Sequence, residues 1–390
     1  MALILFWTAL GLIVYTYVIF PLLVVLRGIL LKKPYKSQDV SPLPLVSVII
    51  AAYNEEKEIG EKLNNILSLD YPKDRLEVVI ASDGSTDRTN AIVSEYEGRG
   101  IKLLALPRLG KAGALNAAVA ASTGEILVFS DANSIYKSDA LRAIVRPFAD
   151  AKVGGVAGNQ VYLKKKGTSL VGSGERSYWS FDRIMKQFES SAGNTISATG
   201  AIYAIRRSLF EPVVEGVTDD FYTSTSVIAR GYRLVFAPDA IAYEAVAGTS
   251  RSEFGRKVRV ITRGLRGVFI ARRQLLNPFR YGFYAIQLFS HKALRRLVVF
   301  LLLLLLLVNP FLWNDGWFYR LTMLGQLGFY GLGLLGYLLD GTRWGRIKIF
   351  TIPYYFCLVN LAVLLAALNI MRGQQIKRWE PHRKVEQSEV

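Results

Sequence analysis

Two kinds of apolar segment alternate with polar sequence along this 390-residue chain. Charged residues are almost absent from residues 2–26 and 298–313 and sparse in residues 321–339 and 349–371, which are long enough for helices that cross a bilayer. Residues 32–296, in contrast, have short β-branched runs separated by helical patterns. The pattern predicts a globular domain with membrane segments on both sides.

The globular region alternates strands with helices. We expect strands at residues 46–51, 76–81, 101–105 and 126–129, helices at 56–67, 87–96 and 111–121, then a helix at 174–189, a strand at 198–205 and a helix opening at 218–220. Such alternation is typical of a parallel sheet covered by helices. The predicted fold class is therefore α/β with a mostly parallel sheet.

The charge balance changes the picture only slightly. Lys and Arg number 48 and Asp and Glu 31, a net charge of +17. The basic residues crowd residues 252–296 and the ends of the membrane segments, so we interpret them as a collar for anionic lipid headgroups and expect no nucleic acid partner. Cys357 is the single cysteine, which excludes an intramolecular disulfide. The two histidines, His291 and His382, are far apart in the sequence, which argues against a zinc site.

The first apolar stretch lacks a basic start and is followed by Lys32 and Lys33, so we expect a retained anchor with the globular domain in the cytoplasm. The predicted parts are an anchor at 1–31, a linker at 32–44, the domain at 45–271, an interfacial helix at 272–293, membrane helices within 294–371 and a basic tail at 372–390. Three final spans would place that tail outside, against the positive-inside rule. We therefore expect Pro353 to break the last segment into a re-entrant or interfacial element.

Polar residues follow the predicted strands, where parallel sheets bind their ligands. Tyr53, Asn54 and Glu55 follow the first strand, Asp83 the second, and Asp131 and Asn133 the fourth. A carboxylate at Asp83 can accept a hydrogen bond from a base or ribose, although a helix-capping turn explains it as well. Oxygen ligands at Asp131 and Asn133 suit Mg²⁺ or Mn²⁺ on a diphosphate, the alternative being that Asn133 only turns the chain.

Three further groups are candidates for chemistry. Lys111 and Asn116 lie in a glycine-containing helix start that lacks the spacing of a P-loop, so we reject that motif. Asp219 and Asp220 open a helix whose dipole favours ionised carboxylates, and one of them can take a proton from a hydroxyl. Arg256, Arg259, Arg263 and Arg266 share one helix face, which meets either lipid headgroups or, through Arg263, a diphosphate.

The order of these motifs over residues 46–266 resembles the family 2 glycosyltransferases, inverting enzymes with a GT-A fold that include cellulose, chitin, hyaluronan and poly-N-acetylglucosamine synthases. The resemblance implies a nucleotide-sugar site at Tyr53, Asn54, Glu55, Asp83, Lys111, Asn116 and Arg263, a metal at Asp131 and Asn133, and an acceptor site at Gly200 and Tyr203. It implies that Thr218-Asp219-Asp220 matches the family's Thr-Glu-Asp, with Asp220 as general base and Asp219 beside it.

Two positions depart from the family pattern. Asn133 replaces the second metal aspartate, and the Gln-x-x-Arg-Trp motif of processive synthases is missing, with Val260 and Gly264 at its Gln and Trp positions. The resemblance still favours transfer from a UDP-sugar, with UDP-glucose or UDP-N-acetylglucosamine foremost, to a growing β-glycan at the plasma membrane. A single transfer to a lipid acceptor is the first alternative.

A catalytically silent membrane scaffold that binds nucleotide sugars is the second alternative. It is disfavoured because Asp83, Asp131, Asp219 and Asp220 occur together, and a silent protein has no need of all four. A transporter is disfavoured because the membrane segments contain almost no ionisable residues.

Overall fold

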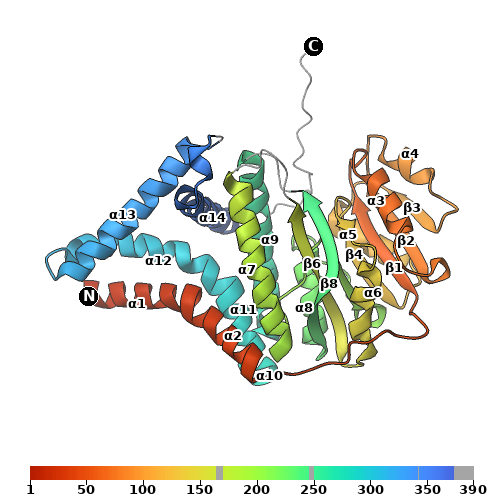
Figure 1. The fold of residues 1–390 in the computed structure, drawn as a ribbon, viewed down its shortest axis with the longest axis horizontal. Helices are drawn as coiled ribbons and strands as arrows, with labels where there is room; N and C mark the ends of the chain where they lie inside the picture. Colours follow the sequence, from red (N-terminus) through yellow and green to blue (C-terminus); the bar gives the residue numbers. More distant parts are fainter. Residues whose placement is uncertain (164–169, 246–249, 341, 373–390) are drawn as a thin grey trace, which may run out of the picture. The chain divides into compact units, whose positions relative to one another are not determined.

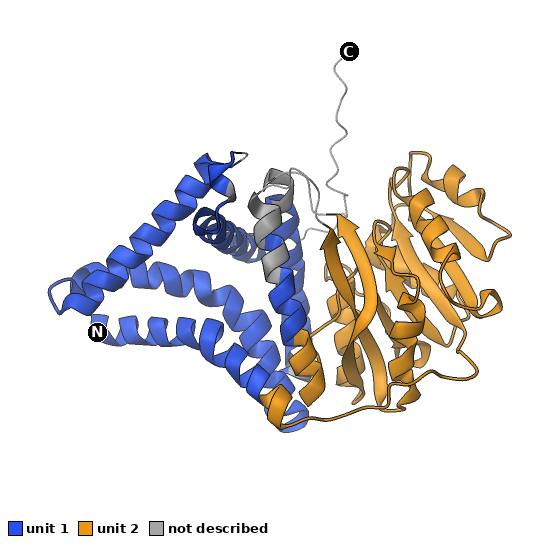
Figure 2. Ribbon diagram, viewed as in Figure 1, with its two compact units in different colours: residues 1–26, 164–185, 246–375 blue, residues 27–163, 186–245, 376–390 orange. Residues whose placement is uncertain are grey.

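The computed structural model describes residues 1–163, 170–245, 250–340 and 342–372 (Figure 1). The chain divides into two compact units, which are coloured separately in Figure 2. Unit 1 comprises residues 1–26, 164–185 and 246–375, and unit 2 comprises residues 27–163, 186–245 and 376–390. Of the predicted basic tail at 372–390, only Arg372 lies within the described residues.

Unit 2 is built on one eight-stranded sheet in the order β3-β2-β1-β4-β7-β6-β8-β5. The strands are β1 (Val46–Ala52), β2 (Leu76–Asp83), β3 (Ile101–Leu106), β4 (Ile126–Ser130), β5 (Ile135–Tyr136), β6 (Val153–Leu163), β7 (Tyr203–Arg206) and β8 (Arg233–Ala245). The pairs β1–β2, β1–β4, β2–β3 and β6–β8 are parallel, whereas β7 is antiparallel to β4 and β6, and β5 to β8. The predicted mostly parallel sheet is confirmed.

The two faces of β1 show why this sheet forms. All seven β1 residues are buried, as expected of a strand covered on both faces. Val48 and its neighbours on one face join a core with α3 (Ile59–Leu67), α4 (Thr89–Ser94) and α6 (Ala140–Val145). Ile49 and its neighbours on the other face pack with α5 (Gly110–Ala120) and α8 (Asp219–Ala229). Helices therefore cover both faces of the sheet.

The predicted strands and helices of the first half of the domain match the observed ones to within a few residues. The strand expected at 198–205 is shorter, because β7 begins only at Tyr203. Neither β6 nor β8 is predicted.

Unit 1 consists of helices. They are α1 (Ala2–Val14) and α2 (Phe20–Leu30), joined by a π-helical turn, α7 (Leu170–Ala192), which continues into unit 2, α9 (Ser250–Leu275), α10 (Pro278–Tyr281), α11 (Phe283–Leu288), α12 (Arg295–Val308), α13 (Trp317–Leu338) and α14 (Lys348–Met371). Within the described residues, four helical stretches are long and apolar enough to cross a membrane, namely Ala2–Leu30, Phe283–Leu312, Trp317–Leu338 and Lys348–Met371. Three such helices were expected after the globular domain, and three are found.

The expectation that Pro353 breaks the last segment is wrong, because α14 runs unbroken through it. Pro353 lies in the second turn of α14, where a proline removes only one helical hydrogen bond. Two glycines of α13 pack closely against this turn, since a Cβ added at Gly336 would lie 2.7 Å from the carbonyl oxygen of Phe350 and one at Gly333 would lie 3.3 Å from that of Pro353. Close packing against α13 supports the turn that contains the proline.

Residues 272–293 do not form the single interfacial helix that was expected. They are divided among the end of α9, the short α10 and the beginning of the long helical stretch that starts at Phe283. The break is local, because the side-chain oxygen of Asn277 caps α10 by accepting the N–H of Phe279 at 3.0 Å, and Pro278 occupies the first helical position.

Candidate functional site

The centre of the candidate site is Lys111, in the first turn of α5. Its Nζ lies 2.9 Å from Oδ1 of Asp131 and 3.1 Å from Oδ1 of Asp219. Burial lowers the pKa of Lys111, but the carboxylates of Asp131, Asp219 and Asp220 raise it more, so the net shift is upward. A permanently charged ammonium thus holds together two carboxylates that would otherwise repel each other.

Three elements bring these groups to one edge of the sheet. Asp131 directly follows β4, Lys111 opens the helix after β3, and Asp219 and Asp220 are the first two residues of α8. The carboxyl ends of β1, β2, β3 and β4 meet here because these strands are parallel. Oδ1 of Asp220 accepts the N–H of Phe221 at 2.7 Å, and both aspartates stand at the N-terminal, positive end of the α8 dipole.

Gly200 lies against the carboxylate of Asp131. The N–H of Asp131 donates to the Gly200 carbonyl at 3.0 Å, and a Cβ added at Gly200 would lie 2.6 Å from Oδ2 of Asp131. Glycine at this position therefore leaves the space that the Asp131 side chain occupies. Gly200 thus shapes the position of Asp131, and its predicted place at the acceptor site stays a prediction.

Asp83 is fully buried and its carboxylate is engaged by the chain itself. Oδ1 accepts the N–H groups of Leu109 at 2.6 Å and Gly110 at 2.9 Å, and Oδ2 forms an ion pair with Arg108. The Arg108 guanidinium also lies 3.3 Å from the centre of the Tyr53 ring. Sequence reasoning missed Arg108, although a basic residue between β3 and the glycine-containing segment was a usable signal.

Asn54 and Glu55 join the loop after β1 to the loop after β2. Asn54 adopts a left-handed backbone (φ 51°), its N–H donates to Oγ of Ser85 at 3.1 Å, and its Oδ1 accepts the N–H of Thr86 at 2.8 Å. The Glu55 N–H donates to Oγ1 of Thr89 at 2.8 Å. These contacts hold the loops after β1 and β2 together beside Tyr53 and Asp83. That Tyr53, Asn54 and Glu55 bind the nucleotide stays a prediction.

Comparison with known families identifies the domain that contains most of this edge of the sheet. Residues 47–214 match the family model described as glycosyl transferase family 2, and this range includes Asp83, Lys111, Asp131 and Gly200. The chain carries a family 2 glycosyltransferase domain.

Relatives of this domain act on different acceptors. A β-monoglucosyldiacylglycerol synthase of Nostoc sp. is 31% identical over 204 residues, covering 50% of this chain and 43% of that protein. A poly-β-1,6-N-acetyl-D-glucosamine synthase of Staphylococcus aureus is 28% identical over 242 residues, covering 60% of this chain and 57% of that protein. The chain therefore spans about half the length of these curated relatives.

A solved mannosyltransferase from Pyrobaculum calidifontis, in complex with GDP-Man and Mn²⁺, is similar along almost its whole length. It superposes with a TM-score of 0.69 at 27% identity, covering 95% of this chain and 99% of that one. This likeness confirms the predicted GT-A-like α/β fold of the glycosyltransferase domain.

Two of the residues carried over from the family motifs make contacts within the protein that the sequence did not predict. The Asn116 amide is committed to the backbone of Val213, donating to its carbonyl at 3.1 Å and accepting its N–H at 2.8 Å. Tyr203 is only 1% exposed and stacks on Phe129 with ring centres 4.7 Å apart. Asn116 therefore joins α5 to the Val213 segment, and its contact with a nucleotide stays a prediction. Tyr203 is a core residue whose side chain is not exposed to an acceptor in this structure.

The donor set at Asp131 and Asn133 is small for a metal site. Among the described residues, no group of three His, Cys, Asp or Glu side chains is arranged to hold a metal ion. Asp131 is 33% exposed and shares Oδ1 with Lys111, and Asn133 is half-buried. One carboxylate and one amide oxygen fit a cation that takes its remaining ligands from a diphosphate and water, as Mg²⁺ commonly does.

Arg263 lies on α9, which belongs to unit 1, whereas the cluster around Lys111 belongs to unit 2. Its contact with a diphosphate stays a prediction. A second arginine of the same helix face, Arg256, forms an ion pair with the fully buried Glu175 of α7, and Nζ of Lys257 lies 3.4 Å from the same carboxylate. At least one member of the predicted arginine face thus pairs with a carboxylate of the protein.

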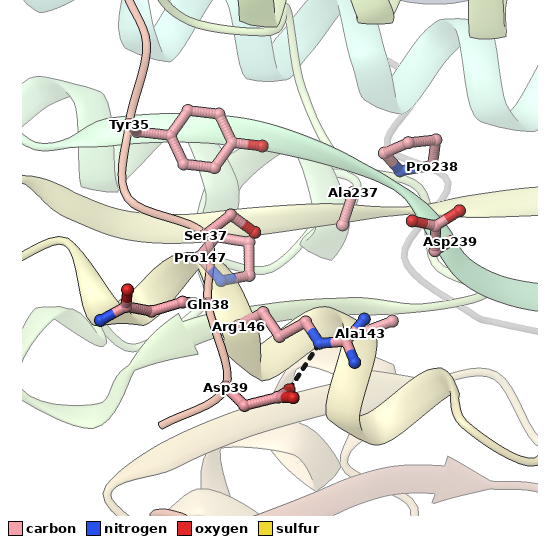
Figure 3. A pocket seen from close by; sticks show the side chains of 10 residues that line it. All are labelled: Tyr35, Ser37, Gln38, Asp39, Ala143, Arg146, Pro147, Ala237, Pro238 and Asp239. Atoms are coloured by element: carbon pink, nitrogen blue, oxygen red, sulfur yellow. Dashed lines mark hydrogen bonds and ion pairs between the residues drawn. The ribbon is translucent and has the colours of Figure 1, made fainter. Parts of the chain in front are cut away.

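A cavity of about 390 Å³ lies elsewhere in the glycosyltransferase domain (Figure 3). Linker residues including Tyr35 and Asp39, the end of α6 and the Pro238 region of β8 line it, and Nε of Arg146 lies 2.7 Å from Oδ1 of Asp39 at its side. It shares no residue with the Lys111 cluster, and Ala143 and Ala237 place it on the α3 and α6 side of the sheet. We therefore do not identify this cavity with the transfer site.

Proposed function

We propose that the protein is a membrane-bound, inverting glycosyltransferase that binds a nucleotide sugar at the edge of the sheet around Lys111. The observation that carries this proposal is the Lys111 cluster, in which the ammonium lies 2.9 Å from the Asp131 carboxylate and 3.1 Å from that of Asp219, next to Asp220 in the chain. The match to the family 2 domain supports it, as does the likeness to a mannosyltransferase solved with a nucleotide sugar and Mn²⁺.

Each acidic residue has a separate role in this proposal. Asp131 and Asn133 would hold a divalent cation, Mg²⁺ or Mn²⁺, which neutralises the diphosphate of the leaving nucleotide. Lys111 keeps the carboxylates in place and adds positive charge close to that diphosphate. Asp220 takes the proton from the acceptor hydroxyl as its oxygen attacks the anomeric carbon, with inversion of configuration there. Asp219 holds Lys111 from the α8 side.

The donor is a nucleotide diphosphate sugar. UDP-glucose and UDP-N-acetylglucosamine are the first donors to test, and GDP-mannose joins them because of the mannosyltransferase likeness. The proposed acceptor is a growing β-glycan at a bacterial plasma membrane, with the glycosyltransferase domain in the cytoplasm. The similarity to a polysaccharide synthase and the four apolar helical stretches support this choice.

A second acceptor class has its own support. Val260 and Gly264 stand where processive synthases have Gln and Trp, and the relative with 31% identity is a glycolipid synthase. A single transfer to a membrane lipid is therefore the alternative. Product size distinguishes the two, since only a processive enzyme releases long chains.

The deciding experiment measures nucleotide release from the purified full-length protein in detergent. Each donor is supplied with Mn²⁺, Mg²⁺ or a chelator, with lipid and oligosaccharide acceptors, to wild type, Asp220→Asn and the control Asp74→Asn, which alters an exposed aspartate. We expect wild type and the control to release nucleotide from one donor, and Asp220→Asn to lose about a thousandfold of this rate. Tight nucleotide binding without any release would instead support the silent scaffold.

A further inference from the structure

Lys62 of α3 is a fully buried lysine that the proposed chemistry does not use. Its Nζ donates to the Ser134 carbonyl at 2.5 Å and lies 3.7 Å from the centre of the Tyr136 ring. The ion pairs found within the described residues include none with Lys62. Burial lowers its pKa to about 7, although the more distant Asp131 and Glu244 act in the opposite direction.

The contacts of Lys62 fall on the segment that directly follows the predicted metal ligands. Asp131 and Asn133 lie in a tight turn that Ser134 closes, because the Ser134 hydroxyl donates to the Asp131 carbonyl at 2.9 Å and its N–H reaches the same oxygen at 3.4 Å. One turn further along α3, the Asn65 amide brackets Tyr136, accepting its N–H at 2.8 Å and donating to its carbonyl at 2.9 Å. Two side chains of α3 thus form hydrogen bonds with the backbone of residues 134–136.

The two contacts differ in what they demand of the fold. Asn65 is a neutral amide whose two hydrogen bonds are satisfied by the backbone. Lys62 places an amine that can ionise in a fully buried site, where one carbonyl and one aromatic face are its partners. Desolvating its charged form costs free energy that a neutral side chain of the same size would not require. Methionine has nearly the same length and shape and would fill the space without desolvating a charge. Packing alone therefore does not account for a lysine at this position.

We propose that Lys62 is a positioning residue of the transfer site: its ammonium fixes the Ser134 carbonyl and so holds the turn that presents Asp131 and Asn133. The expected effect of Lys62 on catalysis rests on the proposed function. The positioning itself does not, because it concerns contacts within the chain.

The direct test is hydrogen–deuterium exchange on the full-length protein in detergent, comparing wild type, Lys62→Met and Lys102→Met. Lys102 is the matched control because its Nζ also donates to a backbone carbonyl, that of Ala121 at 3.0 Å, but at the surface. In Lys62→Met we expect amide exchange about tenfold faster in residues 131–136, with no change elsewhere in the sheet and no fall in Tm. Lys102→Met should leave this segment unchanged.

Two outcomes overturn the proposal. Unchanged exchange of residues 131–136 means that Lys62 does not hold the turn. Faster exchange throughout unit 2 with a lowered Tm means that Lys62 is only a packing residue. If Lys62→Met does not fold, Lys62→Gln, a shorter neutral side chain, replaces it, and exchange in that segment equal to wild type counts equally against the proposal.

Activity provides the second readout. In the transfer assay we expect Lys62→Met to lower kcat about tenfold while the donor KM changes less than about threefold, because the ligands are present but misplaced. If wild type itself shows no transfer with any donor, the proposed function fails while the exchange result still decides whether Lys62 positions the turn. A normal kcat together with faster exchange overturns the catalytic consequence alone.

Discussion

Two lysines of the glycosyltransferase domain, Lys62 fully buried and Lys111 largely buried, have surroundings that give them opposite properties. Lys111, at the start of α5, meets two carboxylates within 3.1 Å, and its pKa is raised. Lys62, in the middle of α3, meets a carbonyl and an aromatic ring, and its pKa is lowered to about 7. The difference teaches that neighbouring charge, rather than burial, decides whether a lysine in this domain stabilises its surroundings or strains them.

The comparison predicts the largest effect at Lys111. Replacing it by Met leaves Asp131 and Asp219 facing each other without their shared cation. We expect the free energy of unfolding to fall by about 2–3 kcal/mol, allowing for the partial exposure of the group, and transfer to fall at least about a hundredfold. Chemical denaturation and nucleotide release measure the two effects. A fully stable Lys111→Met protein would show that the carboxylates do not need the ammonium.

The pH dependence of stability should separate Lys62 from Lys111. The pKa of Lys62 is about 7 in the folded protein and about 10.4 when unfolded. The unfolded chain therefore binds more protons between these values, so the destabilisation by Lys62 is complete below pH 7 and is relieved as the pH rises toward 10. Lys62→Met should be more stable than wild type by about 2 kcal/mol or more at pH 7, and the gap should narrow by about 1 kcal/mol per pH unit.

Denaturation of wild type and Lys62→Met at pH 7, 8 and 9 measures this gap. Lys102→Met serves again as the control and should track wild type at each pH. A gap that stays constant over this range would mean that Lys62 keeps the same charge throughout, and the contrast with Lys111 would be lost.

The smallest effect is expected at Gly200. Alanine there places a Cβ 2.6 Å from Oδ2 of Asp131, which must move the carboxylate away from its position on Lys111. We expect Gly200→Ala to lower transfer about tenfold and stability by about 1–2 kcal/mol. Gly193→Ala is the control because a Cβ there meets nothing within 4 Å. Equal behaviour of the two variants would argue against a tight fit between Gly200 and Asp131.

The first half of the fold could be predicted from sequence because β1, β2 and β4 are continuous β-branched runs with clear helical patterns between them. The second half could not. β6 contains Gly154, Gly155 and Gly158, and β8 contains Pro238, all of which indicate turns in a linear sequence. In the fold these glycines allow close packing, since a Cβ at Gly154 would lie 2.5 Å from Cδ1 of Leu209.

The site divides in the same way. That Lys111, Asp131 and Asp219 would converge follows from their places after strands or at helix starts. The contacts of Arg108 and Lys62 join positions 25 and 72 residues apart, and no local pattern reveals them. The contacts of Asn116 and the burial of Tyr203 could not be predicted for another reason, because a matched motif identifies a residue but does not say what its side chain packs against.

The close approach of α13 and α14 has a consequence for the membrane arrangement proposed above. The glycines at 333 and 336 bring the two backbones together around Pro353, leaving no room for lipid chains at that point. In the proposed membrane arrangement, helices packed this closely gain by inserting together as a hairpin, because each then covers the backbone of the other where the glycines expose it. A methyl group at Gly336 would lie 2.7 Å from the Phe350 carbonyl oxygen, so the two helices would have to move apart. Only a helix with glycine at this position can therefore pack against α14 this closely.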